Sequence, residues 1–322
     1  MKSRFFIGID TSNYTTSAAA VSAAGEVFFA KRLLEVPEKS LGLRQSDALF
    51  SHTRALPEIT GELARKLSEH APDHEICAFG ASSRPRRIEG SYMPCFLAGV
   101  SAAKSAAAFA QKPLYLFSHQ EGHIESARQG CRALGRPFPD GKEFFALHLS
   151  GGTGEILHVQ EDAEGYRAGI LASTLDITFG QLLDRCGVAL ALPFPAGAGL
   201  EKLALQSKKD FRVKVAKSEK GVSLSGFENR FRRLLASGEA KEDAAKFAFC
   251  AVLQGIRELL SFIPEEKRGL PVLFSGGVIS SSFLKDHLQS PRHFFAPPEY
   301  SADNAIGTAY LARRLWEANN EP

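Results

Sequence analysis

The sequence predicts an α/β protein of two similar lobes, each with a mixed sheet of about five strands flanked by helices, and a cleft between the lobes. Two observations support this prediction. A pattern of three apolar strands separated by short turns occupies residues 5–34 and recurs at 144–173. Each copy is followed by helical stretches and then by an isolated apolar strand that leads into a helix.

In the first copy, the predicted strands are FFIGID (5–10), SAAAVS (17–22) and VFFAKRLL (27–34), joined by the polar turns TSNYT and AAGE. The isolated strand is ICAFG (76–80). The helix expected after it is PCFLAGVSAAKSAAAFA (94–110).

In the second copy, the predicted strands are FFALHLS (144–150), EILHVQ (155–160) and YRAGILAS (166–173), joined by the turns GGTG and EDAEG. The isolated strand is PVLFSGG (271–277), and a helix is expected around ISSSFLKDHL (279–288). The same order of elements therefore occurs twice in the chain.

Two further helices are predicted at 243–263 and 301–318, because apolar residues recur there every three and four positions. The polar segment KSEKGVSLSGFENR (217–230) is predicted to be a surface excursion.

The stretch 127–143 contains glycine and proline and is the expected crossing between the lobes. We therefore expect an N-terminal lobe of residues 1–126 plus 301–322, which bears the histidine helix described below, and a C-terminal nucleotide-binding lobe of residues 127–300.

The composition is that of an ordinary globular protein, with 44% hydrophobic and 23% charged residues. No apolar run approaches the roughly 18 residues that a membrane-spanning helix needs, and the start, MKSRFFIGID, leads into a strand rather than a signal peptide. The five cysteines are scattered and form no CxxC pair, which argues against a disulfide framework and a zinc knuckle. The net charge of +3 does not require a nucleic-acid partner. We expect a cytoplasmic protein with no membrane partner.

Three turns rich in glycine, serine and threonine lie at equivalent places of the repeated pattern, at 10–16, 150–154 and 275–277. Glycine lets backbone N–H groups approach phosphate oxygens, because no Cβ stands in the way. Each turn taken alone is also explained as an ordinary hairpin or strand-to-helix turn. Their repetition favours phosphate binding.

A possible metal site begins at His119 and His123 in the stretch FSHQEGHIESA. Ser118 and Glu121 form an S-x-x-E capping box, so a helix should begin here and place both imidazoles on one face. Glu121 falls on the far side of that helix, which disfavours zinc-protease chemistry. Asp303 is the candidate third ligand. The alternatives are two histidines that bind nothing and an aspartate that caps a helix.

Nine stretches of the chain, in order, resemble the tRNA threonylcarbamoyladenosine synthase family, known also as glycoprotease or O-sialoglycoprotein endopeptidase. They are GIDTSNYTTSAAAV (8–21), LRQSDALFSHTRALP (43–57), SHQEGHI (118–124), LHLSGGTGEIL (147–157), TLDITFGQLLDR (174–185), PFPAGAGLEKLA (193–204), SLSGFEN (223–229), FSGGVISSSFL (274–284) and YSADNAIGTAY (300–310). The likeness covers nearly the whole chain.

The resemblance implies a duplicated actin-like fold, as in sugar kinases and heat-shock ATPases. It also implies one divalent metal on His119, His123 and Asp303, and a bound ATP, ADP or threonylcarbamoyl-AMP. Imidazole and carboxylate ligands suit zinc or iron better than magnesium. The residues implied to bind that nucleotide are Ser150, Gly151, Gly152, Asp176, Gly180, Asp184, Gly197, Glu201, Gly276 and Gly277. The catalytic hydroxyls are assigned to Thr11, Ser12 and Thr16.

The chain departs from the family pattern at positions that handle substrate, where it has Tyr14, Thr15, Thr153, Gln181, Glu228 and Ser281. The loop SSRPRRIEGSYMP (82–94) also replaces the family's G-P-G loop. Arginine pairs well with carboxylate or phosphate, so Arg84, Arg86, Arg87 and Tyr92 are expected to line a changed acceptor pocket. The alternative is a solvated basic loop.

Three functions follow from these residues. The first is metal-dependent threonylcarbamoyl transfer to tRNA adenosine. The second is carbamoyl- or acyl-adenylate chemistry on a non-tRNA acceptor. The third is a non-catalytic nucleotide-binding subunit that pairs with a family-related protein. A peptidase is disfavoured, because the sequence has no G-x-S-x-G elbow and Glu121 faces away from the histidines.

Overall fold

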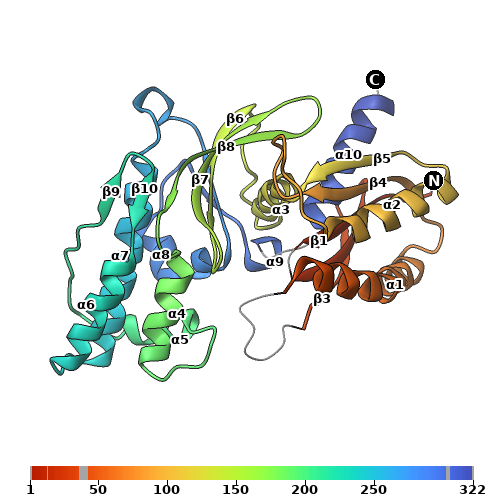
Figure 1. The fold of residues 1–322 in the computed structure, drawn as a ribbon. Coiled ribbons are helices and arrows are strands. Elements are labelled where there is room, and N and C mark those ends of the chain that lie inside the picture. Colours follow the sequence, from red (N-terminus) through yellow and green to blue (C-terminus); the bar gives the residue numbers. More distant parts are fainter. Residues whose placement is uncertain (1, 13, 36–42, 302–304, 321–322) are drawn as a thin grey trace. The chain divides into compact units, whose positions relative to one another are not determined.

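The structure is a computed structural model that describes residues 2–12, 14–35, 43–301 and 305–320 (Figure 1). Its contacts divide the chain into two compact units. Unit 1 comprises Met1–Ala133, Glu161–Arg167 and Glu299–Pro322, and unit 2 comprises Leu134–Gln160 and Ala168–Pro298.

Unit 1 contains a five-stranded sheet in the order β3-β2-β1-β4-β5. The first three strands pair antiparallel, whereas β4 runs parallel to β1 and β5 runs parallel to β4. This arrangement confirms the predicted meander and the isolated strand after it. The strands are β1 (Arg4–Ser12), β2 (Thr15–Ser22), β3 (Val27–Leu33), β4 (Glu75–Arg84) and β5 (Leu114–Ser118).

Helices cover both faces of this sheet, because alternate side chains of β1 point to opposite sides. Phe5, Ile7 and Ile9 pack with residues of α1 and α2, whereas the ring of Phe6 lies 5.5 Å from that of Trp316 in α10. The helices of unit 1 are α1 (Gln45–His70), α2 (Phe96–Ala110), α3 (His119–Ala133) and α10 (Ile306–Asn320), and the short α9 (Pro298–Ser301) begins at the boundary with unit 2.

Unit 2 contains a seven-stranded sheet in the order β12-β11-β6-β7-β8-β10-β9. It includes the second meander and the predicted parallel strand, which pairs with β6. The strands are β6 (Glu143–Leu149), β7 (Gly154–Glu161), β8 (Tyr166–Thr174), β9 (Ala216–Ser218), β10 (Gly221–Ser223), β11 (Val272–Ser275) and β12 (His293–Phe295).

The core of unit 2 lies between this sheet and its helices, and its largest side chains include Phe145, Phe179, Phe247 and Phe274. The helices are α4 (Phe179–Ala189), α5 (Gly197–Ala204), α6 (Ser225–Ala236), α7 (Lys241–Leu260) and α8 (Ser282–His287), with 3₁₀ turns at Glu265–Lys267 and Gly277–Ser280.

The prediction of a surface excursion at 217–230 was wrong. Residues of this segment form most of β9, all of β10 and the start of α6, and Val222 and Leu224 are fully buried in the core of unit 2. The segment has few apolar residues, and polar residues separate them, so its sequence shows no strand or helix pattern. Packing against the rest of unit 2 decides its structure. The segment therefore adds two short strands beyond the five expected for this lobe.

The expected crossing at 127–143 differs in detail from the structure. Helix α3 continues to Ala133, because Ala127 and Cys131 are buried on it, so the proposed boundary after residue 126 falls inside a helix. The last helix begins at Ile306 rather than at 301. No helix in the described part of the chain is long and apolar enough to cross a membrane.

Candidate functional site

The helix that bears the histidine pair begins where the sequence predicts. The backbone N–H of Ser118 donates to Glu121 Oε2 at 2.8 Å, and the backbone N–H of Glu121 donates to Ser118 Oγ at 3.3 Å, which confirms the capping box. The other carboxylate oxygen of Glu121 accepts the backbone N–H of Tyr166 at 3.0 Å. Both oxygens of Glu121 thus serve packing and helix capping.

The two imidazoles of α3 face each other. Nε2 of His119 lies 2.8 Å from Nε2 of His123. Two nitrogens that each lie about 2.1 Å from one ion are about 3.0 Å apart at a 90° angle and about 3.4 Å apart in tetrahedral geometry, so these two rings are close enough to share one metal.

A carboxylate behind His119 sets its orientation. Nδ1 of His119 lies 3.1 Å from Oδ2 of the buried Asp10, which also accepts a hydrogen bond from Ser12 Oγ at 2.7 Å. A proton on Nδ1 donated to Asp10 leaves the lone pair on Nε2, directed toward His123. Metal-binding histidines typically donate their other ring N–H to a carboxylate in this way, which fixes the orientation of the ring.

The third predicted ligand cannot be placed, because Asp303 lies outside the described residues. Among residues 2–12, 14–35, 43–301 and 305–320, no group of three or more His, Cys, Asp or Glu side chains forms a metal-ligand cluster. The donors that are described, two imidazoles backed by a carboxylate, fit a divalent ion such as zinc or iron. The metal site stays a prediction.

Thr11, Ser12 and Thr16 are buried in strands β1 and β2, because the turn between these strands is shorter than predicted. Thr11 Oγ1 donates to the carbonyl of Cys95 at 2.9 Å and accepts the N–H of Gly99 at 3.1 Å. Thr16 Oγ1 lies 2.8 Å from His52 Nδ1. The Ser12 hydroxyl donates to Asp10, so all three hydroxyls have partners inside unit 1, and their assignment as catalytic groups stays a prediction.

Arg87 in the loop after β4 differs from both interpretations of the sequence. The guanidinium of Arg87 forms ion pairs with Asp162, at 2.9 Å, and with Glu164, and its side chain is only 15% exposed. Burial alone would raise the pKa of Asp162, but hydrogen bonds from Arg87 and from the backbone of Glu164 outweigh it and lower that pKa to about 2. Arg87 is therefore neither solvated nor open to an acceptor, while Tyr92 is exposed.

Unit 2 contains a pocket of about 490 Å³ among α4, α5 and the turn after β11. Ligand pockets of this size class are common in proteins. Six of the ten residues expected to bind nucleotide line it, namely Gly151, Gly180, Asp184, Gly197, Glu201 and Gly277. The other lining residues are Leu183, Pro195, Ala198, Phe249, Val278, Ser280 and Ser281.

Close backbone contact explains why Gly180 is a glycine. A Cβ at this position would lie 2.8 Å from Cα and N of Gly151 and from the carbonyl oxygen of Ser150. Helix α4 can therefore approach the turn after β6 only without a side chain at position 180. Thr178 adds a second link, because its hydroxyl donates to the carbonyl of Gly151 at 2.8 Å.

The N-terminus of α4 also has a capping box that the sequence analysis missed. The backbone N–H of Gln181 donates to Thr178 Oγ1 at 3.1 Å, and the N–H of Thr178 donates to Gln181 Oε1 at 3.1 Å. The T-x-x-Q spacing at 178–181 was the available signal. The apolar lining residues of the pocket had no such signal, because their pattern is that of any core residue.

The remaining predicted nucleotide residues lie outside the pocket lining. Ser150 Oγ accepts the N–H groups of Gly152 and Thr153 at 3.3 and 3.0 Å, which closes the turn after β6. Gly276 has a φ of 97°, a conformation that favours glycine, at the turn after β11. These residues shape two turns of unit 2.

Asp176 caps the start of α6 and does not line the pocket. Its carboxylate accepts the backbone N–H groups of Ile177 at 2.7 Å, Leu224 at 2.8 Å and Ser225 at 3.0 Å. Partial burial would raise the pKa of Asp176, but these hydrogen bonds outweigh it and lower the pKa below its usual range.

The lowered pKa of Asp176 predicts an acid-dependent loss of stability. Because the folded pKa lies below the unfolded value of about 3.9, the ionised group stabilises the fold above that pH, and this contribution disappears as pH falls through the folded pKa. We expect Asp176→Asn to flatten the acid limb of a plot of unfolding free energy against pH, measured by urea unfolding. An unchanged acid limb would contradict this role.

Glu201 joins α5 to the start of α8. Its Oε1 accepts from Ser281 Oγ at 2.8 Å, Ser282 Oγ at 3.0 Å and the N–H of Phe283 at 2.9 Å. Glu201→Ala removes the acceptor of all three hydrogen bonds, so it should lower the unfolding free energy by about 1–3 kcal/mol. Glu201→Gln, which keeps an acceptor oxygen, should lose less in the same urea-unfolding measurement. Equal losses in the two variants would rule out the hydrogen-bond explanation.

The two sheets, each with the meander-and-parallel-strand pattern, define the class of protein as one with the duplicated actin-like ATPase fold. Over its whole length the chain matches 56% of a solved chain described as full-length HypF in the phosphate- and nucleotide-bound form, with a TM-score of 0.54 and 12% identity. At that identity the likeness concerns the fold alone. Within this class, the chain belongs to the tRNA N6-adenosine threonylcarbamoyltransferase family, whose model matches residues 51–310.

Similar proteins include enzymes of that name. The chain is 27% identical over 299 residues to the tRNA N6-adenosine threonylcarbamoyltransferase of Neorickettsia sennetsu, covering 90% of this chain and 85% of the relative. It is 24% identical over 321 residues to a probable bifunctional tRNA threonylcarbamoyladenosine biosynthesis protein of Methanothermobacter thermautotrophicus, covering 97% of this chain but only 56% of that protein. The family is one of transferases, which agrees with the sequence analysis.

Proposed function

We propose that the chain transfers a threonylcarbamoyl group from threonylcarbamoyl-AMP to the N6 amine of an adenosine in tRNA. The amine attacks the carbamoyl carbon, a C–N bond forms, the C–O bond to phosphate breaks, AMP leaves and the amine releases a proton. The observation that supports this proposal most strongly is the pocket of unit 2. It is lined by six residues at positions where the family resemblance implies nucleotide contacts.

The pocket supplies the features that an adenylate requires. Gly151 and Gly277 offer backbone without a side chain, which suits phosphate oxygens. The carboxylates of Asp184 and Glu201 lie in the lining and can accept hydrogen bonds from ribose hydroxyls. Phe249 and Val278 provide apolar contacts for a base. ATP or ADP would occupy the same pocket.

The histidine pair of unit 1 would hold a divalent ion together with Asp303. Such an ion supplies a Lewis acid for an acyl or phosphate oxygen. The chain's own contribution is orientation. Asp10 accepts a hydrogen bond from Nδ1–H of His119, and Ser12 donates a hydrogen bond to Asp10. The lone pair of His119 Nε2 thereby stays available to bind the metal.

Transfer with purified components tests this function. The chain is incubated with threonylcarbamoyl-AMP made from isotope-labelled threonine and with unmodified tRNA, alone and with a family-related subunit. We expect label in N6-threonylcarbamoyladenosine after digestion of the tRNA to nucleosides. Consumption of the adenylate without label in tRNA, with the related subunit present, would contradict the proposal.

A second function, transfer to an acceptor other than tRNA, is motivated by the changed residues of the first hairpin. Tyr14 stands where the family has an acidic residue, and it is 41% exposed on unit 1. The same experiment separates the two functions. Adenylate consumption that depends on an added amine or hydroxyl compound, and not on tRNA, would favour the second one. Nucleotide binding without any turnover would favour a non-catalytic subunit.

A further inference from the structure

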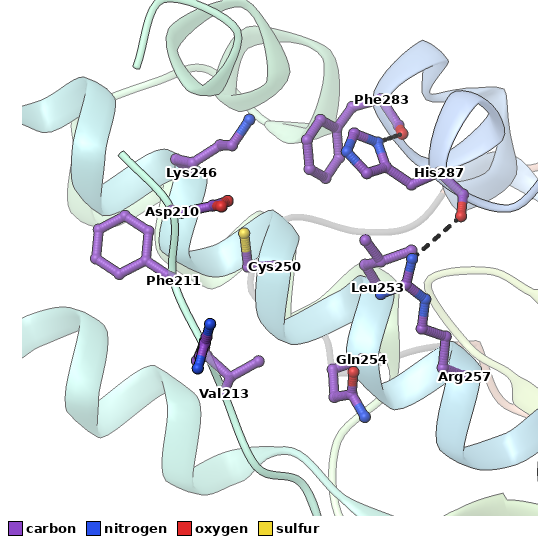
Figure 2. Close-up of a pocket in the computed structure, with 11 residues that line it drawn as sticks. Asp210, Phe211, Val213, Lys246, Cys250, Leu253, Gln254, Arg257, Phe283 and His287 are labelled. Atoms are coloured by element: carbon purple, nitrogen blue, oxygen red, sulfur yellow. Dashed lines mark hydrogen bonds between the residues drawn. The ribbon is translucent and has the colours of Figure 1, made fainter. Parts of the chain in front are cut away.

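A second pocket of unit 2 shares no lining residue with the nucleotide pocket. It has a volume of about 290 Å³ and lies among α7, α8 and the extended segment after α5 (Figure 2). Neither the proposed function nor the family resemblance assigns these residues a role. The lining consists of Asp210, Phe211, Arg212, Val213, Lys246, Cys250, Leu253, Gln254, Arg257, Phe283 and His287.

The extended segment forms a fixed wall of the pocket. Lys209 pairs with Asp243 of α7 at 3.0 Å and also with Glu239, which ties the segment to α7 and to the turn before it. The ring of Phe211 lies 5.7 Å from that of Phe247 in an edge-on arrangement. The pocket is therefore built by packing and ion pairs on the side opposite α8.

Positive charge exceeds negative charge in this pocket. Arg212, Lys246 and Arg257 line it, against the single carboxylate of Asp210. In the described part of the chain, none of these three cations forms an ion pair with a carboxylate within 4.0 Å. Lysine and arginine in a concave site attract anions, because the low-dielectric walls focus their field.

Two of the cations are already oriented by neighbours in α8. The ammonium of Lys246 lies 4.4 Å from the centre of the Phe283 ring, and Arg257 donates to the carbonyl of His287 at 3.3 Å. These contacts leave further N–H donors on both groups. In Figure 2, the thiol of Cys250 points into the space between Lys246 and Phe283.

Apolar side chains complete the site. Phe211, Val213, Leu253 and Phe283 line the same cavity, and the ring of His287 lies 4.3 Å from that of Phe283 at an angle of 36°. A ligand held here would thus meet aromatic and aliphatic surface as well as cations. Pockets that combine apolar walls with a few oriented polar groups are typical of small-molecule sites.

We propose that this pocket binds a small organic anion, with its phosphate or carboxylate in the positive field of Arg212, Lys246 and Arg257 and its apolar body against Phe211, Leu253 and Phe283. A simple inorganic anion lacks the apolar contacts, and a neutral aromatic compound lacks the ionic ones. The proposal concerns a separate site and does not depend on the transfer reaction.

Calorimetric titration with four probes tests both halves of the site. Phenyl phosphate and benzoate carry the two candidate head groups, whereas inorganic phosphate lacks the apolar body and phenol lacks the charge. We expect phenyl phosphate or benzoate to bind in the millimolar range or tighter, and the stronger of them identifies the head group. Inorganic phosphate and phenol should bind at least about tenfold more weakly. Absence of binding by both organic anions, or equal binding of inorganic phosphate, would overturn the proposal.

Variants of the lining residues test whether the probe binds in this pocket. Lys246→Met and Arg257→Gln keep most of the side-chain volume and should each weaken the better probe by about tenfold. Arg233→Gln removes an exposed arginine of α6 that does not line the pocket, and it should leave the affinity unchanged. Equal weakening in all three variants would indicate a general charge effect and contradict the assignment.

Alkylation of Cys250, which lines the pocket, gives an independent measure of whether the pocket is occupied. It is partly accessible, whereas the other four cysteines are buried, and burial raises the pKa of its thiol, so alkylation is best followed at alkaline pH. The bound probe should slow alkylation of Cys250 by iodoacetamide, as measured by mass spectrometry. Saturating ADP should neither protect Cys250 nor displace the probe. Displacement of the probe by ADP would assign it to the nucleotide pocket and refute a separate site, whatever the outcome of the transfer assay.

Discussion

Replacing Gly180 by alanine is expected to abolish calorimetrically detectable ADP binding while unit 2 stays folded. The added Cβ would lie 2.8 Å from backbone atoms of Gly151 and Ser150, and backbone cannot rotate away as a flexible side chain can. The turn after β6 must therefore move out of the pocket wall. Such overpacking costs about 1–3 kcal/mol, so the unfolding free energy should also fall by about that amount.

Gly199→Ala is the matched control for this change. It adds the same methyl group in a helix of unit 2, but the nearest atom would be Leu192 Cδ1 at 3.5 Å, an ordinary contact. This variant should bind ADP as the unchanged chain does and gain about 0.4–1 kcal/mol of stability. If Gly180→Ala bound ADP with an affinity within about threefold of the unchanged chain, the pocket would not be the nucleotide site.

Replacing His123 by alanine is expected to remove the bound metal. Nε2 of His123 lies 2.8 Å from Nε2 of His119, and only a site that keeps both nitrogens can hold one ion between them. Protein purified without chelators should contain about one divalent ion per chain, and the variant should contain almost none by elemental analysis. Asp10→Asn should lower the metal affinity by about 10–100-fold, because it removes the carboxylate that orients His119.

His70→Ala provides the comparison. His70 is exposed at the end of α1 and its Nδ1 contacts the carbonyl of Lys66 at 2.8 Å, so its loss should not change the metal content. A metal content of His123→Ala equal to that of the unchanged chain would exclude the histidine pair as the site.

The fold was largely predictable because its signals are local. Short apolar runs bounded by polar turns marked the strands of both meanders, and their repetition marked the duplication. The segment that forms β10 was missed because its burial depends on β8, far away in the sequence. A single sequence does not show which distant strand or helix a segment will pack against.

In the candidate sites too, residues of short motifs were predictable, whereas contacts between distant residues were not. Residues such as Gly151 and Gly180 belong to short motifs, and the structure brings them together in one pocket. The burial of Thr11 under the start of α2 and the ion pair between Arg87 and Asp162 join residues more than 70 positions apart. Asp176 looked like a ligand in its motif, yet its carboxylate is occupied by backbone N–H groups.

The most direct measurement of the central claim is the N6-threonylcarbamoyladenosine content of tRNA, by mass spectrometry, in cells depleted of their own transferase. The cells would receive this chain, with a family-related subunit from the same source, or one of its variants. We predict that the unchanged chain, Gly199→Ala and His70→Ala restore the modified nucleoside, and that Gly180→Ala and His123→Ala do not. Absence of the nucleoside from cells that accumulate the folded, unchanged chain would contradict the account.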